Sequence, residues 1–302
     1  MKAERIKGFT LVELLVVLAI VAMLIGLLMP ALGQIRKYAG TVKQKAQIGS
    51  IEIALSLYKN EPAFGQYPPS HGCESCLATD DANLYNGAQT LAEAMVGWDL
   101  LGVHPDTAYR ADGLDISGNP TIYPSTSGEP NITNLGKRKG PYLDRANIGV
   151  FKADQVFNTY VVTNRFMICD TFTKNRSIAG KQYKIGTPIL YYRANPSAIN
   201  TQLIDPASSF PINYRTNIYN YMDNFYLLIS SYNNNNKNNN FYDSAGAKVA
   251  NFFTFISDPM IPLATGALGR PQKPDSFILI SAGPDGIYGT KDDICNFEPN
   301  IK

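Results

Sequence analysis

An uninterrupted apolar stretch lies close to the start of the chain. Residues 1–8, MKAERIKG, are short and basic, and they lead into FTLVELLVVLAIVAMLIGLLMP, in which Glu13 is the one charged residue. The 21 residues from Phe9 to Met29 would form a helix of about 31 Å, at ~1.5 Å per residue, which matches the hydrocarbon core of a bilayer. The pattern therefore predicts a membrane-spanning helix over residues 9–29.

The apolar positions that follow recur at helical spacing, which predicts that the helix continues to about Asn60. Pro62 and the turn residues 65–69 should end it. Such a helix has an apolar first half and an amphipathic second half that packs on a head region, residues 61–302. The apolar positions of the second half are Leu32, Ile35, Tyr38, Val42, Ala46, Ile51, Leu55 and Tyr58.

The head region combines a further helix with several strands, so the expected fold class is α+β with an antiparallel sheet. Residues 88–101 are predicted to be helical. The β-branched and aromatic runs between turn residues predict strands over residues 156–162, 166–171, 188–193, 226–231 and 277–281.

The charge balance bears on the kind of partner. The chain has 27 Lys and Arg against 25 Asp and Glu, and without residues 1–8 the two counts are equal. Nucleic-acid-binding proteins need an excess of cationic side chains to displace counterions from the phosphates. We therefore expect no nucleic acid as partner.

Glu13 distinguishes between three interpretations of the apolar segment. A cleaved secretory signal has a shorter apolar core and a small-residue cleavage site after it, for which only residues 31–33, ALG, offer a hint. An ordinary membrane anchor leaves Glu13 unexplained, because a carboxylate in the apolar phase costs roughly 2.5 kcal/mol or more. A costly charge favours a third interpretation in which Glu13 has a function.

The string GFTLVE, from Gly8 to Glu13, closely resembles the class III signal of type IV pilins and type II secretion pseudopilins. The resemblance implies that a prepilin peptidase cuts between Gly8 and Phe9 and methylates the new N-terminus. It also implies that Glu13 pairs with the terminal ammonium of Phe9 in a neighbouring subunit. Because Gly8 has no side chain, a peptidase could approach the backbone closely.

The same resemblance sets the expected location. The leader would stay in the cytoplasm and the head would lie outside it, as a single-pass inner-membrane precursor that then enters a filament. The positive-inside rule alone leaves the orientation open, because Arg36, Lys37, Lys43 and Lys45 follow the apolar segment. Residues 48–70 are similar to the helix end and the tyrosine-proline turn of major pseudopilins. Those proteins are much shorter, so residues 71–275 are expected to be largely an insertion.

An acidic loop lies near the C-terminus, at residues 283–294. Asp285, Asp292 and Asp293 are close in sequence, and neighbouring glycines would let the carbonyls of Ile287 or Tyr288 turn inward. Oxygen ligands suit a hard cation such as Ca²⁺, and the loop resembles the structural calcium loop of major pseudopilins. The alternative is an acidic turn with solvated carboxylates.

The four cysteines, Cys73, Cys76, Cys169 and Cys295, are consistent with disulfides in a head outside the cytoplasm. Four cysteines allow three connectivities, and the spacing does not choose between them. A zinc site would need further ligands at a spacing that the sequence does not show.

The chain lacks the motifs of the common catalytic sites, and its two histidines form no such pattern. We therefore expect a structural subunit and no enzyme. Its partners would be copies of itself, other pilins or pseudopilins, the prepilin peptidase and an inner-membrane assembly platform. The alternatives are a type IV pilin for adhesion, motility or DNA uptake, and an anchored binding protein or enzyme that uses a pilin-type leader.

Overall fold

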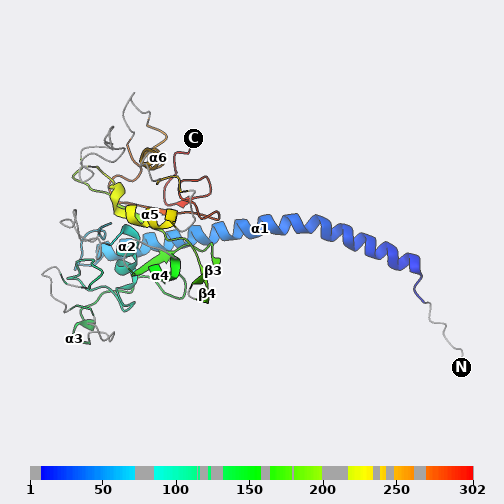
Figure 1. Ribbon diagram of the computed structural model, residues 1–302, viewed down its shortest axis with the longest axis horizontal. Helices are drawn as coiled ribbons and strands as arrows, with labels where there is room; N and C mark the ends of the chain where they lie inside the picture. The colour runs from blue at the N-terminus through cyan, green and yellow to red at the C-terminus, as the bar shows by residue number, and fades with distance from the viewer. Residues whose placement is uncertain are drawn as a thin grey trace. The chain divides into compact units, whose positions relative to one another are not determined.

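The computed structural model describes residues 8–71, 85–113, 115, 122–123, 132–157, 164–178, 180–198, 217–233, 239–242, 248–261 and 270–301. The chain divides into two compact units, Met1–Val42 and Lys43–Lys302. Helix α1, Leu11–Asn60, runs from the first unit into the second, which we call the head unit (Figure 1). The expected class, α+β with a long N-terminal helix, is confirmed.

In the first unit α1 buries none of its large apolar side chains. Every Leu, Val, Ile and Met from Leu11 to Met29 is exposed. Among the described residues α1 is the one helix that is long and apolar enough to cross a membrane, by length and composition. The expected span over residues 9–29 lies in this helix, apart from Phe9 and Thr10, which precede it.

In the head unit α1 is amphipathic, and the predicted apolar positions Ile51, Leu55 and Tyr58 are buried. The other predicted positions, Leu32, Ile35, Tyr38, Val42 and Ala46, are exposed, so the buried face of the helix begins later than expected. Ile48, Ile51, Leu55 and Tyr58 follow one another at intervals of three or four residues, and each is at most 3% exposed. Residues at these intervals share one face of a helix. The helix ends at Asn60, close to the expected end.

A three-stranded antiparallel sheet forms the centre of the head unit. Its strands are β5, Leu190–Arg193, β6, Phe277–Ser281, and β7, Ile294–Cys295, with β6 in the middle. The register places Leu190 opposite Ile280. The predicted strand over 277–281 is confirmed, and that over 188–193 is confirmed in its second part.

Two further antiparallel pairs precede β5 in the chain. Strand β1, Gly149–Lys152, pairs with β2, Phe166–Cys169, which confirms most of the predicted strand over 166–171. Strand β3, Lys174–Ile178, and β4, Lys181–Ile185, form a hairpin.

The remaining elements are short. They are α2, Gly87–Val96, α3, Ile132–Leu135, α4, Ala153–Val156, the 3₁₀ helix η3, Tyr221–Asn224, α5, Phe225–Asn233, and α6, Val249–Phe255. Helix α2 is entirely buried and begins at a capping box of Asn86 and Gln89. It ends earlier than the predicted helix over 88–101.

Two predicted strands need correction. The run over 226–231 lies in helix α5, because a short apolar run fits a buried helix as well as a strand. The predicted strand over 156–162 begins at the last residue of α4, and residues 158–162 lie outside the described residues.

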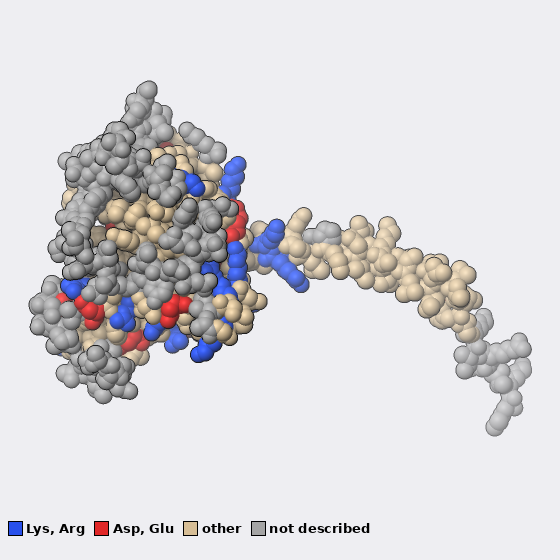
Figure 2. All heavy atoms as spheres, viewed as in Figure 1, with Lys and Arg blue, Asp and Glu red and all other residues tan. Residues whose placement is uncertain are grey.

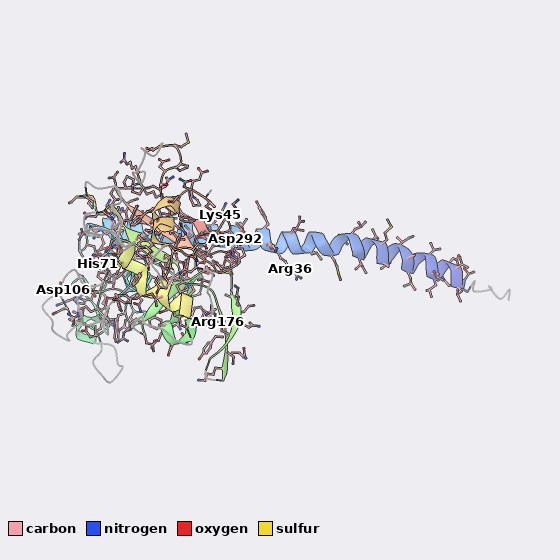
Figure 3. The ribbon with its side chains drawn as sticks, turned by 45° about the horizontal axis from the view of Figure 1, so that its top comes forward. Arg36, Lys45, His71, Asp106, Arg176 and Asp292 are labelled. Atoms are coloured by element: carbon pink, nitrogen blue, oxygen red, sulfur yellow. The ribbon has the colours of Figure 1, made fainter. Side chains whose placement is uncertain are left out.

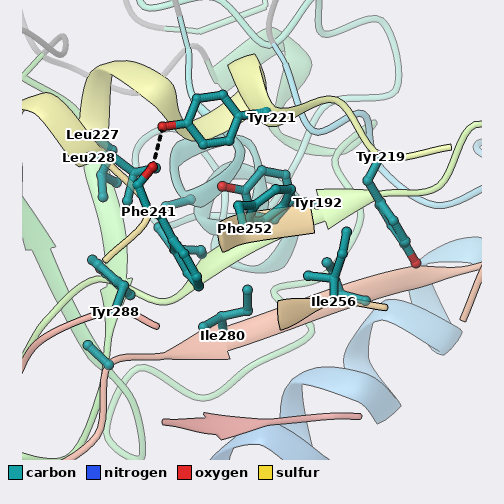
Figure 4. Packing of buried hydrophobic residues seen from close by; sticks show 14 of the residues in the cluster. Tyr192, Tyr219, Tyr221, Leu227, Leu228, Phe241, Phe252, Ile256, Ile280 and Tyr288 are labelled. Carbon is teal, nitrogen blue, oxygen red and sulfur yellow. Dashed lines mark hydrogen bonds between the residues drawn. The ribbon is translucent and has the colours of Figure 1, made fainter. Parts of the chain in front are cut away.

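The central sheet separates two cores. Tyr192, Ile278 and Ile280 point to one side and contact the aromatic residues of α6, whereas Tyr191 and Leu279 face the side on which α1 and α2 pack. Alternation of this kind follows from the two-residue repeat of a strand. Figure 4 shows the first core, in which the Tyr221 hydroxyl donates to the carbonyl of Phe241 at 2.8 Å.

Candidate functional site

The predicted processing site lies ahead of α1. Gly8 and Phe9 are outside regular structure, and Phe9 is 81% exposed. A Cβ added at Gly8 would meet nothing within 4 Å. The peptide bond between them is therefore accessible, and no described neighbour crowds the glycine.

Helix α1 starts at a capping box that holds Glu13. The backbone N–H of Thr10 donates to Oε2 of Glu13 at 2.9 Å, and the hydroxyl of Thr10 donates to the same oxygen at 2.8 Å. In return the N–H of Glu13 donates to Oγ1 of Thr10 at 3.2 Å. These bonds satisfy backbone groups that a helix start leaves open, and they fix the carboxylate beside the residue that would become the N-terminus.

The acidic loop begins with a tight turn after β6. The N–H of Gly286 donates to the carbonyl of Gly283 at 3.2 Å, and Gly283, Gly286 and Gly289 all have positive φ, between 64° and 83°. Asp285 accepts the N–H of Ile287 on Oδ1 at 2.8 Å. The loop thus turns sharply directly after β6.

Oxygen atoms of the loop converge on the hydroxyl of Thr290. Its Oγ1 lies 3.4 Å from the carbonyl oxygen of Ile287 and 3.4 Å from Oδ1 of Asp292. Oδ1 of Asp293 lies 3.2 Å from the same atom. A hydroxyl has one proton to donate, so it cannot bond all three oxygens at once. The cluster therefore holds more acceptors than Thr290 can satisfy.

Asp293 is the buried member of this cluster, at 9% exposure. Its Oδ2 accepts the N–H of Gly289 at 2.7 Å, and its Oδ1 accepts the N–H of Thr290 at 3.3 Å. Burial raises the pKa of Asp293 to about 7, and the charge of Asp285 adds to this, while the hydrogen bonds oppose it. A carboxylate with this pKa is easily neutralised by a proton or by a cation.

Lys174 of strand β3 reaches the loop from outside. Its ammonium donates to the carbonyl of Asp285 at 2.7 Å. Burial raises the pKa of Asp285 and the charge of Asp292 raises it further, whereas Lys174 lowers it. One cation of the protein itself therefore already lies beside the loop.

The residues fit a hard cation in donor chemistry. Asp285, Asp292, Asp293 and the carbonyl of Ile287 supply oxygens of the kind that Ca²⁺ prefers. No three His, Cys, Asp or Glu side chains within the described ranges form a metal-binding group on their own. A bound ion would therefore depend on carbonyl oxygens or water as well as on the aspartates.

The structure does not bring every predicted residue to this cluster. The carbonyl of Tyr288 accepts the N–H of Asn240 at 3.0 Å, and its hydroxyl donates to the carbonyl of Pro188, outside the loop. Thr290 and Lys174 were missed by the sequence analysis. The spacing of Thr290 from the aspartates offered a signal, whereas Lys174 is distant in sequence and offered none.

Two of the four cysteines lie among the described residues. Cys169 is a buried free thiol, and Cys295 is a half-buried free thiol. The structure thus joins neither of them in a disulfide. Cys73 and Cys76 lie outside the described residues, so a bond between them stays a prediction.

Comparison with known proteins adds one finding. Residues 5–29 match the family described as the prokaryotic N-terminal methylation motif. No curated protein and no solved structure matches the chain. The match covers Gly8, Phe9 and Glu13, and it therefore concerns the leader and the apolar part of α1 rather than the head unit.

Proposed function

Because the chain carries the leader of type IV pilin-like proteins, we propose that it is a structural subunit of a type II secretion pseudopilus or of a related type IV pilus-like filament. Such a leader implies processing by a prepilin peptidase and assembly with pilins. It also suggests an inner-membrane precursor that is then exported. We propose further that the chain has no enzymatic activity.

The observation that carries this proposal is the exposed apolar start of α1 with Glu13 held at its first turn. Cleavage after Gly8 would leave a terminal ammonium on Phe9. In a bundle of such helices the carboxylate of Glu13 and the ammonium of a neighbouring Phe9 can pair. Pairing offsets the cost of placing either charge in an apolar environment.

The acidic loop favours a pseudopilus over a type IV pilus, on the resemblance of its sequence to the calcium loop of major pseudopilins. We propose that Ca²⁺ binds there through Asp285, Asp292, Asp293 and the carbonyl of Ile287. The ion would neutralise the gathered carboxylates and supply the positive charge that the oxygen cluster lacks. Its role would be structural, since it would hold the loop against β6 and β7.

The test of assembly is a Glu13→Val variant, examined by electron microscopy of filaments and by processing of the precursor. The expected result is normal cleavage with loss of filaments, because the apolar span remains while the charge pair is lost. Glu61→Gln is a suitable control, since Glu61 makes a surface ion pair with Lys139 at 3.0 Å. If the parent chain never forms filaments and Glu13→Val behaves like it, the chain is an anchored monomer and the proposal fails.

A further inference from the structure

Two long segments of the chain contain basic residues and no acidic ones. One extends from Leu14 to Ile51 and the other from Thr171 to Ile204. Their cationic residues are Arg36, Lys37, Lys43 and Lys45 in the first and Lys174, Arg176, Lys181, Lys184 and Arg193 in the second. The chain without residues 1–8 has equal numbers of acidic and basic side chains. The excess of basic side chains is therefore a property of these two segments and not of the whole chain.

The head unit brings parts of the two segments together. Nε2 of Gln47 donates to the carbonyl of Cys169 at 3.0 Å, and Oε1 of Gln44 accepts the N–H of Thr171 at 2.8 Å. Strand β3 starts at Lys174, directly after this contact. The β3–β4 hairpin therefore begins close to Gln44 of α1.

Four lysines of these two segments are exposed: Lys43 and Lys45 on α1, and Lys181 and Lys184 on β4, with Lys181 at the tip of the hairpin. None of them takes part in an ion pair with another described residue. In the hairpin Lys184 lies opposite Asn175, and Lys181 lies opposite Ile178, so the strand pairing provides no counter-charge. We call these four side chains the basic edge.

Several Lys and Arg side chains lie along one edge of the head unit in Figure 2, with Asp or Glu side chains among them. In Figure 3, Lys45, Arg176 and Asp292 lie on one side of this unit, and His71 and Asp106 lie on the opposite side.

The acidic loop carries negative charge close to the start of β3. Its Asp285 faces Lys174, which donates to the carbonyl of that residue at 2.7 Å. Arg176 is engaged as well, since its guanidinium donates to the carbonyl of Val156. Lys174 is thus engaged by the loop, whereas the four lysines of the basic edge remain available to an external anion.

We propose that the basic edge binds the anionic headgroups of membrane phospholipids while the subunit is a membrane precursor. The helix that enters the head unit at Lys43 is the helix whose apolar part can span a bilayer, so this end of the head unit is the one next along the chain to the membrane. Spread lysines suit a fluid array of phosphates, whereas recognition of a fixed phosphate favours the planar fork of arginine. The proposal rests on the membrane-inserted precursor of the proposed function.

The test uses the full chain in lipid nanodiscs made of phosphatidylcholine alone or with about a third of phosphatidylglycerol. Hydrogen exchange of the peptides that cover β3 and β4 reports contact with the surface. The expected result is slower exchange in the anionic discs, reversed by high salt. A Lys181→Gln/Lys184→Gln variant should bind the surface roughly 25-fold more weakly, since each surface lysine contributes about fivefold. Its hairpin should therefore exchange at the same rate in both kinds of disc. Lys137→Gln/Arg145→Gln, which changes two exposed cations elsewhere in the head unit, should keep the slower exchange in the anionic discs.

The two proposals fail in different ways. If the chain does not enter discs of either composition, the membrane precursor is wrong. If it inserts and the hairpin exchanges equally in both discs, the basic edge does not bind lipid. Protection of the hairpin by added duplex DNA in phosphatidylcholine discs, without protection by phosphatidylglycerol, would overturn the proposal in favour of a nucleic acid.

Discussion

The side-chain amide of Gln47 donates a hydrogen bond to the main-chain carbonyl of Cys169 at 3.0 Å, inside the head unit. Gln44 adds a second bond to Thr171 nearly one turn earlier, and both glutamines are buried. Apolar contacts along α1 tolerate small shifts of the helix, whereas these directional bonds do not. They therefore define the position of α1 against the end of β2.

Substitution of Gln47 by Leu should destabilise the head unit by about 1–2 kcal/mol, because a buried hydrogen bond is lost although the volume is nearly kept. The melting temperature of the full chain in detergent should fall by about 2–8 °C. Ser50→Ala is the matched control, since the hydroxyl of Ser50 bonds only within α1, to Ala46 at 2.9 Å on the exposed side. Equal melting temperatures for the two variants would show that the Gln47 bond does not position the helix.

The acidic loop depends on Gly283 for steric reasons as well as for its φ of 64°. A Cβ at this position would lie 2.1 Å from the carbonyl oxygen of Asp292, whereas a Cβ at Gly180, with φ of 78°, meets nothing within 4 Å. Both Gly→Ala variants place alanine in the left-handed region, at about 1–2 kcal/mol. Gly283→Ala should lower the melting temperature clearly more than Gly180→Ala. Similar losses would mean that the loop can shift away from the clash.

The sequence predicted those parts of the fold that depend on local pattern. The repeat of Ile51, Leu55 and Tyr58 sufficed for this part of the helix, and the apolar run of residues 277–281 between turn residues sufficed for β6. The run over 226–231 has no such repeat, and its helical state is decided by burial in the core.

The candidate loop was also predicted only in part. Its aspartates are neighbours in sequence, so their proximity required no knowledge of the fold. The contact of Lys174 with Asp285 spans 111 residues, and the contact of Tyr288 with Asn240 also comes from a distant segment. Only tertiary structure can show which carbonyls remain available to a ligand.

A buried carboxyl in α2 makes stability depend on pH. Oε1 of Glu93 accepts the hydroxyls of Thr107, at 2.5 Å, and Tyr123, at 3.0 Å. Burial nevertheless raises the pKa of Glu93 to about 7. Between pH about 4.3 and 7 the folded chain retains a proton that the unfolded chain has lost, so stability decreases as the pH rises through this window.

The melting temperature of the parent should therefore be higher at pH 5 than at pH 8 in the absence of divalent cations. Asp170, whose pKa burial raises to about 7, and Asp223, for which the value is about 6, act in the same direction. Glu93→Gln should reduce the difference between the two pH values, mainly by stabilising the chain at pH 8. Glu298→Gln, an exposed control, should leave it unchanged. A variant at Glu93 with the full pH dependence of the parent would refute this assignment.

Calcium and protons should compete for the acidic loop, because the pKa of Asp293 is about 7 in the absence of a cation. At pH 8 the carboxylate is charged and available, whereas at pH 5.5 the folded chain holds it protonated. Calcium should therefore raise the melting temperature relative to a chelator, and by more at pH 8 than at pH 5.5. Asp293→Asn keeps the size of the side chain and should abolish the increase.

Asp258→Asn is the matched control. Asp258 also caps a turn, because it accepts the N–H of Met260 at 2.9 Å, but it lies outside the loop. If the parent melts at the same temperature with calcium and with chelator at pH 8, the loop binds no metal and is held by its own hydrogen bonds and Lys174.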